Sequence, residues 1–522
     1  MRPIDRTSIA GKQFPVAEQF ALVVLGAGPT GVAAAVEAAA SGLSVLLVDE
    51  HPVASALIGL DVPWMFGERM TAAVQSQGRM LERIVAARPG LQAAFDAGVE
   101  VRLGVYAWAA FVEGPTSRAL PCRMLALADE QCSWLVGFER MIVAAGARDL
   151  ALAFPGWDRP GVMGAQGFAA AVRLYGAFAG RRIVVLGSGA AARRVMQQAR
   201  AAGVEVAAVV DVAAAPAAGF DVPVHGGCVV REVLGAGDVA GVVVAPVGGG
   251  AAMRIDCDTI VSALDVVANV EMFDLLGCAT AFRPERGGHV PVTDAAGRCT
   301  VAGIYAAGDC AGVDDGMIAD AAVAEAQGRA AARTAAADAG QAVAAEDLAP
   351  VGGGDRDAPR RQWLQAHAGP DTPALMICRC EEVTLRDLLG VRPPAYLTFD
   401  ETNFAQRDLR SLAADGPVNQ DQVKRLTRAG MGACQGRRCR EQVQSLLALQ
   451  GNQPTGAVAM PSYRAPLRPL PLSVLAAHDE TAEMQANWTT WFGIPAQWLP
   501  HWEKVPDNPE FLGGRLFKDA QK

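Results

Sequence analysis

The amino-acid sequence predicts an α/β protein with two dinucleotide-binding units and a smaller, mainly helical domain. An apolar strand, a glycine-rich turn, an alanine-rich helix and a second strand follow one another from residue 20 to residue 48. The same succession returns between residues 182 and 210. Strands that alternate with helices in this way form parallel sheets. Four cysteines in two close pairs between residues 374 and 450 mark the third unit.

Composition and charge exclude several classes of protein. The chain has 522 residues, enough for three or four domains, and its net charge of −9 offers no basic surface for nucleic acid. Residues 1–19 carry charges and no long apolar run, and glycines interrupt the most apolar stretch, so neither a signal peptide nor a transmembrane segment is expected. An odd number of cysteines, 11, favours a reducing compartment. We therefore expect a cytoplasmic protein that does not bind nucleic acid.

The first glycine-rich turn contains Gly26, Gly28 and Gly31, and Asp49 ends the next strand. The first glycine permits the tight turn, the second lets a pyrophosphate approach the backbone, and the third lets helix and strand pack closely. The helix N-terminus attracts phosphates, and Asp49 can accept hydrogen bonds from an adenosine ribose. The pattern therefore predicts a dinucleotide site rather than an ordinary glycine turn.

A later strand indicates that this dinucleotide is FAD. Residues 300–308 form an apolar run that ends in Asp309, and a helix is expected from Gly316 to Ala336. The carboxylate can hold a ribityl hydroxyl, and the helix N-terminus can stabilise a reduced, anionic flavin. The alternative is a core strand with a capping Asp. The predicted FAD site consists of Gly26, Gly28, Gly31, Asp49, Gly146, Gly308 and Asp309.

The second glycine-rich turn contains Gly187 and Gly189, with Ala192 at the third position and Asp211 at the end of the next strand. An acid at that place favours NAD over NADP, because it suits free ribose hydroxyls. The unit can equally hold another adenine nucleotide or persist as a scaffold. It therefore predicts a second nucleotide site whose occupant stays open.

The cysteine pairs are Cys378 with Cys380, and Cys434 with Cys439. Four thiolates in two close pairs are what a [2Fe–2S] cluster requires, and neighbouring glycines let backbone N–H groups point at the sulfurs. A structural zinc site usually has two to four residues between paired ligands, so zinc fits this spacing less well. Free structural thiols are the third alternative.

No catalytic residue is assigned. The first half of the chain lacks the close cysteine pair that a disulfide reductase uses, and the histidines show no metal spacing. The other cysteines are expected to be small buried residues, with a redox role for Cys310 as the less favoured alternative. These cysteines are Cys122, Cys132, Cys228, Cys257, Cys278, Cys299 and Cys310.

The succession of elements predicts six segments, arranged as a two-dinucleotide-binding (glutathione reductase-like) flavoprotein with an added domain. They are an FAD-binding domain in two parts (1–150 and 291–336), an inserted NAD-binding-like domain (151–290), a linker (337–373), a [2Fe–2S] domain (374–450) and a Pro-rich and Trp-rich extension (451–522).

Five segments of the sequence resemble one family. They are Ala144–Asp149, Phe154–Gly161, Ala306–Asp309, Cys378–Thr384 and Thr427–Cys439. They resemble the larger flavoprotein subunits of hetero-oligomeric amine and opine dehydrogenases and oxidases. This family includes the α subunits of sarcosine oxidase and of proline or hydroxyproline dehydrogenase, the A subunits of octopine and nopaline oxidases, and the B subunit of hydrogen cyanide synthase. The last segment resembles a bacterioferritin-associated-ferredoxin-like [2Fe–2S] domain.

The resemblance implies that the amine is oxidised on a flavin in a partner subunit, with or without a small third subunit. The FAD and the cluster of this chain then carry electrons between that flavin and an acceptor, which agrees with the lack of an evident acid or base. Two alternatives remain. One is a self-contained NADH-dependent reductase that passes electrons through FAD to its own cluster. The other is a non-enzymatic iron–sulfur module on a flavoprotein scaffold.

The sequence departs from the family at three places. Residues 50–59 replace a Pro-x-x-Gly-Gly-Gln run, which puts the contacts to the flavin ring in doubt. Residues 395–417 form an insertion that can loop out without moving the cysteines. Residues beyond about 476 carry none of the motifs of this family, and this tail contains Trp488, Trp491, Trp498 and Trp502. The tail is expected either to dock a partner or to cover the chain's own flavin domain.

Overall fold

The computed structural model describes residues 16–53, 71–113, 120, 122–349, 353–394, 396–397, 407–477 and 482. The Trp-rich tail, most of residues 50–59 and part of the expected insertion lie outside the described residues. Within them, no helix combines the length and the apolar composition that a membrane span requires.

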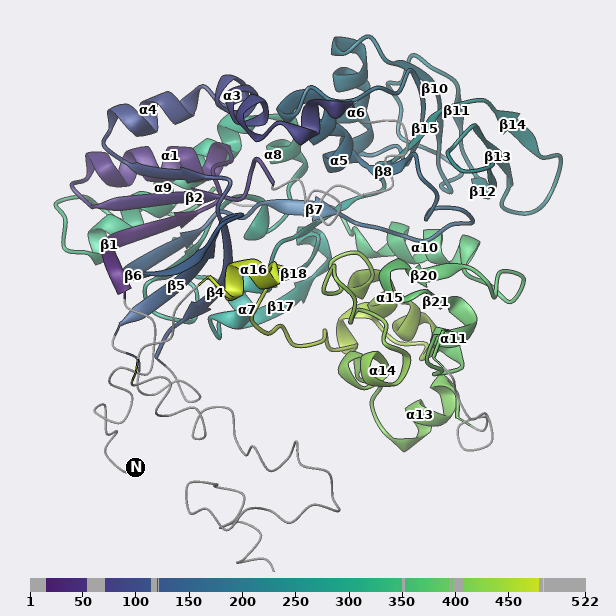
Figure 1. The fold of residues 1–522 in the computed structure, drawn as a ribbon. Coiled ribbons are helices and arrows are strands. Elements are labelled where there is room, and N and C mark those ends of the chain that lie inside the picture. Colours follow the sequence, from purple (N-terminus) through teal and green to yellow (C-terminus); the bar gives the residue numbers. More distant parts are fainter. Residues whose placement is uncertain are drawn as a thin grey trace, which may run out of the picture.

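A seven-stranded sheet forms the first unit, and six of its strands follow the order β3-β2-β1-β6-β5-β4 (Figure 1). The seventh strand, β19, pairs with residues 141–143 of β6, beyond the part of β6 that pairs with β5. Its parallel strands are β1 (Val16–Leu25), β2 (Val45–Asp49), β3 (Glu100–Leu103), β6 (Ser133–Val143) and β19 (Ile304–Ala306), and its antiparallel strands are β4 (Tyr106–Phe111) and β5 (Arg123–Ala128). Helices α1 (Pro29–Ala40), α4 (Gly90–Asp96) and α9 (Ala321–Asp338) bury their small apolar side chains on one face. This is the predicted FAD-binding architecture, closed by a strand more than 150 residues downstream.

Two elements of this unit differ from the expectation. The helix expected from Gly316 to Ala336 is split into α8 (Asp315–Ala319) and α9, because Asp320 takes an extended conformation and caps α9 by accepting from the Ala322 N–H. The strand expected over residues 300–308 is only β19, since residues 299–304 form a turn in which the Cys299 N–H donates to the Ile304 carbonyl.

The inserted unit contains a second parallel sheet, in the order β11-β10-β9-β15-β8. Its strands are β8 (Val162–Gly164), β9 (Arg182–Leu186), β10 (Glu205–Val210), β11 (Val224–His225) and β15 (Thr259–Ser262), and α6 (Ala190–Ala201) connects β9 to β10. A three-stranded antiparallel sheet, β12 (Cys228–Leu234), β13 (Gly241–Pro246) and β14 (Met253–Ile255), extends it. The chain enters and leaves this unit through β7 (Ala147–Asp149) and β16 (Val266–Ala268), which pair with each other. The second glycine turn, residues 187–189, lies between β9 and α6, and Asp211 directly follows β10.

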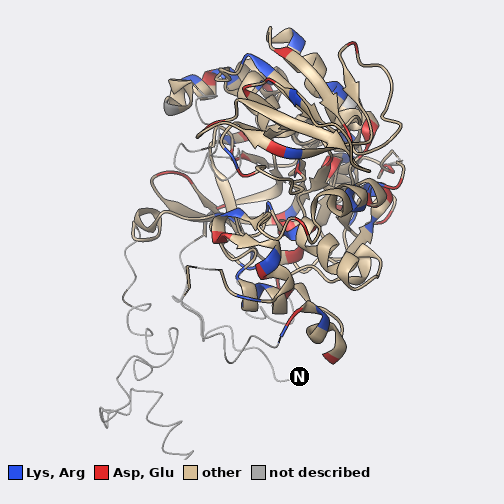
Figure 2. Cartoon of the chain, turned by 90° about the vertical axis from the view of Figure 1, so that its right-hand side faces the viewer, with Lys and Arg blue, Asp and Glu red and all other residues tan. Residues whose placement is uncertain are grey.

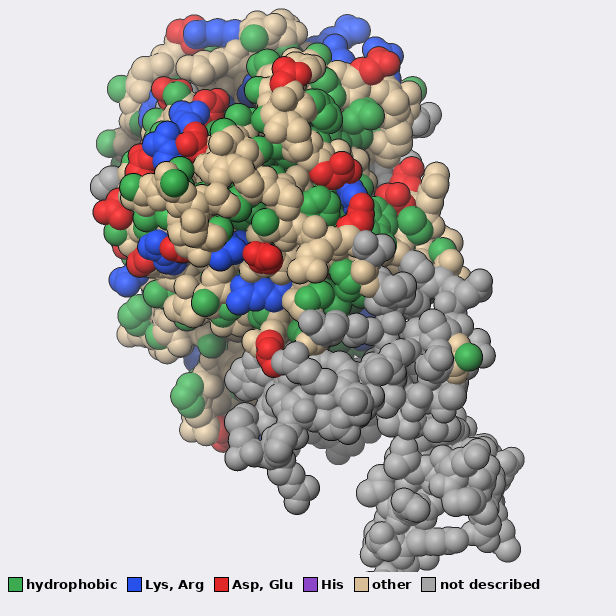
Figure 3. All heavy atoms as spheres, turned by 90° about the vertical axis from the view of Figure 1, so that its left-hand side faces the viewer, with side chains coloured by type: hydrophobic (Ala, Val, Ile, Leu, Met, Phe, Trp, Pro, Cys, Tyr) green, Lys and Arg blue, Asp and Glu red, His purple; other side chains and the backbone are tan. Residues whose placement is uncertain are grey.

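The third unit is mainly helical. It contains β20 (Met376–Cys378), β21 (Val383–Thr384), α11 (Leu385–Leu389), α13 (Leu409–Asp415), α14 (Gln420–Thr427) and α15 (Arg440–Gln450). Seen from the side that carries this unit and the inserted unit, positively and negatively charged residues are interspersed along the chain (Figure 2). On the opposite face, apolar side chains lie scattered among charged and polar ones (Figure 3).

The segment expected to be a linker contains a buried helix, α10 (Asp357–His367). Trp363 is only 1% exposed and its indole N–H donates to the Ala153 carbonyl at 3.2 Å, while the Arg360 guanidinium pairs with Asp265. The Gly- and Pro-rich stretch before it suggested a linker, but Pro359 lies in the first turn, where the missing N–H costs no helical hydrogen bond.

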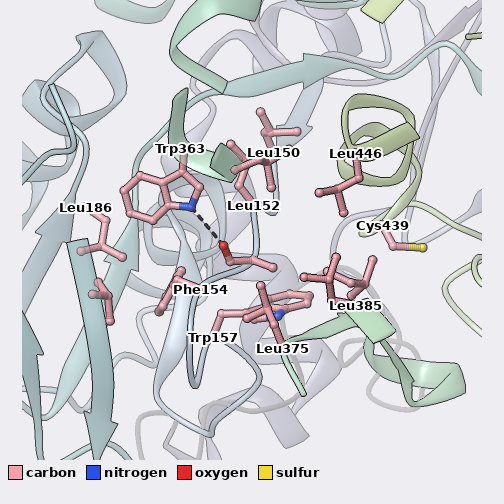
Figure 4. Close-up of a cluster of buried hydrophobic side chains, with 14 of the residues drawn as sticks. Leu150, Leu152, Phe154, Trp157, Leu186, Trp363, Leu375, Leu385, Cys439 and Leu446 are labelled. Atoms are coloured by element: carbon pink, nitrogen blue, oxygen red, sulfur yellow. Dashed lines mark hydrogen bonds between the residues drawn. The ribbon is translucent and has the colours of Figure 1, made fainter. Parts of the chain in front are cut away.

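One hydrophobic core joins the inserted unit, α10 and the helical unit (Figure 4). It contains Phe154 and Leu186 from the inserted unit, Trp363 from α10, and Leu446 and Cys439 from the helical unit. After α15, residues 459–471 run back to the first sheet, where the Leu467 N–H donates to the Trp108 carbonyl at 2.7 Å. The cysteine-bearing unit is therefore packed against both other units.

Candidate cofactor sites

The first glycine turn leaves open space at one position only. Gly26 has a φ of +107°, and a Cβ at Gly31 would lie 1.7 Å from the Gly26 carbonyl oxygen. A Cβ at Gly28, in contrast, would meet no atom within 4 Å. The backbone at Gly28 is thus exposed to empty space at the N-terminus of α1, as a pyrophosphate-binding turn requires.

That space belongs to a cavity of about 840 Å³. Five of the seven residues predicted for FAD line it, namely Gly26, Gly28, Asp49, Gly146 and Asp309. The other two, Gly31 and Gly308, do not line the cavity. Gly31 lets α1 approach the turn, and Gly308, with a φ of +73°, lies against the Thr30 side chain. The residues and the volume therefore fit a bound dinucleotide.

The Asp49 carboxylate is already heavily hydrogen-bonded. It accepts from the Ala27 N–H at 2.6 Å and from the His51 N–H at 2.8 Å, and it pairs with Arg88 at 3.2 Å. Although burial opposes ionisation, Arg88 and His51 hold the pKa of Asp49 below its usual range. Asp49 therefore stays ionised at the wall of the cavity.

Asp309 is different, because its Oδ1 is buried without a hydrogen-bond partner among the described residues. Burial raises the pKa of this carboxyl to about 6. The neighbouring Cys310 is fully buried, its thiol donates to the Val143 carbonyl, and burial raises the pKa of that thiol to about 12. An unsatisfied acceptor at the wall of the cavity is suited to receive a ligand hydroxyl.

The second glycine turn has the same backbone features. Gly187 has a φ of +95°, and a Cβ at Gly189 would meet nothing within 4 Å. Asp211 lies beside the turn, where its Oδ2 accepts from the Ser188 hydroxyl at 2.6 Å. The Ser188 oxygen in turn accepts from the Ala217 N–H at 3.0 Å, so the loop after β10 is held against the turn.

The four predicted cysteine ligands converge. The Sγ atoms of Cys378 and Cys380 are 3.9 Å apart, and those of Cys380 and Cys434 are 3.5 Å apart. The Gly430 N–H donates to the Cys378 Sγ at 3.4 Å, and Cys439 completes the group through its contact with Cys378. The contact with Cys380, together with burial, raises the pKa of the Cys434 thiol above its usual range.

The described residues contain no group of His, Cys, Asp or Glu side chains placed to hold a metal ion. The donor chemistry nevertheless fits an iron–sulfur cluster, since four sulfurs gather from two chain segments and a backbone N–H already points at one of them.

The cysteine loop adjoins the large cavity. Arg437, between Cys434 and Cys439, lines the large cavity and also a neighbouring one of about 370 Å³ that Arg438 lines as well. Arg148 of β7 donates to the Arg437 carbonyl at 3.0 Å and pairs with Glu271 at 3.0 Å and with Glu441. These contacts tie the loop directly to the first unit.

Sequence reasoning missed three residues of this region. Arg148, Asp149 and Arg194 line the smaller cavity, but only the first two belong to a segment that the family resemblance singled out, and it assigned them no role. Burial raises the pKa of Asp149 to about 6, although it accepts from two backbone N–H groups. The available signal in the sequence was the pair of adjacent charged residues, Arg148 and Asp149, shortly after the apolar strand that ends at Val143.

A family model described as pyridine nucleotide-disulphide oxidoreductase matches residues 20–328, which is more than half of the chain. The chain belongs to this family. A second model, the sarcosine oxidase A3 domain, matches residues 394–479 of the chain. The predicted two-dinucleotide-binding α/β fold is confirmed, the protein is an oxidoreductase, and the family supports FAD as its cofactor.

Relatives extend the match over most of the chain. The A subunit of opine oxidase from Agrobacterium tumefaciens (strain Ach5) is 28% identical over 88% of this chain and 92% of its own length. The alpha subunit of sarcosine oxidase from Rhizobium meliloti (strain 1021) is 32% identical over 38% of this chain and 19% of its own length. The predicted resemblance to the larger subunits of these oxidases is confirmed. The crystal structure of L-proline dehydrogenase from P. horikoshii shares the fold, with a TM-score of 0.61 at 18% identity over 89% of this chain and 81% of that one.

Proposed function

We propose that this chain is the electron-transfer subunit of a multi-subunit oxidase or dehydrogenase that acts on the CH–NH bond of an opine or another secondary amine. It would carry FAD and a [2Fe–2S] cluster and relay electrons between an acceptor and the flavin subunit that oxidises the substrate. Similarity to the A subunit of opine oxidase over most of both chains supports the substrate class.

The observation that carries the proposal is the position of the cysteine loop beside the flavin cavity. Arg437 lies between two of the four cysteines, lines the cavity, and receives a hydrogen bond from Arg148 at 3.0 Å. A cluster held by Cys378, Cys380, Cys434 and Cys439 would thus adjoin bound FAD with only this loop between them. Such closeness is what a relay needs.

The residues assigned to FAD would each contact a different part of the cofactor. Gly28 and the N-terminus of α1 would bind the pyrophosphate, Asp49 the adenosine ribose and Asp309 a ribityl hydroxyl. Gly146, with a φ of +66°, turns the chain at the edge of the cavity. When bound, FAD supplies two-electron chemistry and can exchange electrons singly with an iron–sulfur cluster.

Of the four described histidines, His51, His225, His289 and His367, only His51 lines the large cavity, which supports a partner as the place of substrate oxidation. His289 and His367 are held in the core, where burial lowers the pKa of each to about 4. The His51 ring lies 3.0 Å from Asp49, at the ribose end of the cavity. None of these three side chains is placed to take a proton from an amine beside Asp309.

Co-expression with and without the partner subunit tests this division of labour. The complex should reduce a dye with an opine, proline or sarcosine, and this chain alone should contain flavin and iron but remain inactive. Oxidation of any of these amines by the chain alone would contradict the proposal.

The acid at Asp211 and the open space at Gly189 favour a second candidate, an NADH-dependent reductase. Anaerobic mixing with NADH separates the two. Rapid loss of the flavin absorbance near 450 nm would support the reductase, and an unchanged spectrum would exclude it. A flavin that no donor reduces would instead favour a non-enzymatic iron–sulfur module.

A further inference from the structure

An ion pair joins the two segments that carry the proposed cluster ligands, residues 378–382 and 428–439. The Arg428 Nε lies 2.6 Å from the Glu381 Oε2, although the two residues are 47 positions apart in the chain. Glu381 directly follows Cys380, and its side chain is only 9% exposed. Arg428 caps the C-terminal end of α14. The ion pair therefore connects the first cysteine segment to the start of the second.

Arg428 also opens the turn that contacts the sulfurs. Its carbonyl accepts from the N–H three residues later at 2.9 Å. Within this turn, the Gly430 N–H donates to the Cys378 Sγ at 3.4 Å. A Cβ at Gly432 would lie 2.6 Å from the Cys380 Sγ, so the backbone approaches that sulfur closely. The Arg428 side chain thus holds the first cysteine segment, while its backbone begins the turn that touches the sulfurs of that same segment.

A tyrosine shares the carboxylate oxygen of the ion pair. The Tyr396 hydroxyl donates to the Glu381 Oε2 at 2.5 Å, and the Arg428 Nε lies 3.2 Å from that hydroxyl. Tyr396 belongs to residues 395–417, the segment that departs from the family pattern as an insertion. The start of the insertion therefore contacts the ion pair beside the cysteines.

The two charges of the pair lie beside the proposed cluster and oppose each other. Reduction adds one negative charge to a [2Fe–2S] cluster, and charge is one of the factors that set its reduction potential. A lone Arg428 cation would stabilise the reduced cluster, and a lone Glu381 carboxylate would destabilise it. Since the two groups are in direct contact, their effects on the cluster offset each other.

We propose that Glu381 and Arg428 are positioning residues for the cluster. Their ion pair holds the two cysteine segments together, and its balanced charges keep the reduction potential of the cluster from shifting in either direction. Tyr396 supports the pair by binding the shared oxygen, which gives the insertion a role at the cluster. This inference rests on the proposed function, because it requires the cluster.

Redox titration of the cluster-containing complex, followed by electron paramagnetic resonance, tests the balance of charge. Glu381→Gln should raise the midpoint potential of the cluster, because it leaves the Arg428 cation unbalanced. Arg428→Met should lower the potential, because it leaves the carboxylate unbalanced, and Arg428→Lys should keep it near wild type. The double variant Glu381→Gln/Arg428→Met should also return to the wild-type potential. Opposite shifts that cancel are not expected from a change in packing alone.

Release of iron to a chelator tests how the pair holds the segments together. Arg428→Met should release iron at least about fivefold faster than wild type, because a charged hydrogen bond between the segments is lost. The double variant should release iron as fast, although its potential is restored, and Tyr396→Phe should release iron faster than wild type. The matched control is Arg333→Met, since Arg333 of α9 pairs with Glu37 of α1 at 2.7 Å and is 41% exposed, against 37% for Arg428. This control should change neither the potential nor the rate of iron release.

Equal midpoint potentials in wild type, Glu381→Gln and Arg428→Met would overturn the balance of charge. Iron release from Arg428→Met at the rate of the Arg333→Met control would overturn the holding role of the ion pair. Absence of iron from the wild-type protein is a separate result, which would refute the proposed function itself.

Discussion

Replacing Asp309 by Asn should stabilise the flavin-free protein at high pH. The pKa of this carboxyl is raised from 3.8 to about 6 by burial, so the folded state favours its protonated form. A difference of about two pKa units corresponds to about 3 kcal/mol. The free-energy cost of ionising Asp309 in the folded state is absent below about pH 4, grows between pH 4 and 6, and is complete above pH 6. Asparagine removes it without a change of shape.

Thermal unfolding of the flavin-free protein at pH 4 and pH 8 measures this effect. The melting temperature of the variant should lie several degrees above that of wild type at pH 8, because each kcal/mol of unfolding free energy shifts it by about 2–4 °C. At pH 4 the two proteins should melt at the same temperature. Asp96→Asn, at an exposed position of α4, should change neither value. In the presence of FAD the order should reverse, because the variant loses an acceptor for the ligand. Equal melting temperatures of the Asp309 variant and wild type at pH 8 would refute the reasoning.

Three further predictions concern the turn, the tie between units and the cysteines. Gly31→Ala should unfold at lower temperature, because its Cβ would lie 1.7 Å from the Gly26 oxygen, whereas Gly28→Ala should keep its melting temperature and bind FAD weakly in a fluorescence titration. Arg148→Met should lower the free energy of unfolding by about 3–5 kcal/mol, because it removes the partner of buried Glu271 and of partly buried Glu441. Adding Glu→Gln at both positions should recover most of the loss; no recovery would show that their charges do not matter. Cys434→Ser should lose iron in elemental analysis and Cys257→Ser, at another buried position, should retain it; full iron in both would exclude Cys434 as a ligand.

The sequence predicted the parts of the fold that depend on local pattern. Glycine spacing after an apolar strand identified both nucleotide turns, since only a few residue types allow such backbone geometry. Arg148 was not predictable as the tie between units, because its partners Glu271 and Glu441 lie more than 120 residues away in the chain. The burial of α10 also escaped prediction, as its Gly- and Pro-rich approach resembles a linker and its core contacts come from distant segments. Long-range contacts leave no periodic signal in a single sequence.

The continuous core around Trp363 has a consequence for how the protein is made. Cys439 packs in the same core as Phe154 and Leu186, so the pocket for the cysteines is completed only after the inserted unit has folded. The helical unit leaves the ribosome last and meets a surface that is already formed. Insertion of the proposed cluster would therefore be a late step of biogenesis, and we expect that the cysteine-bearing unit does not fold as an independent ferredoxin. A truncated chain that begins at residue 374 would expose half of a core to water.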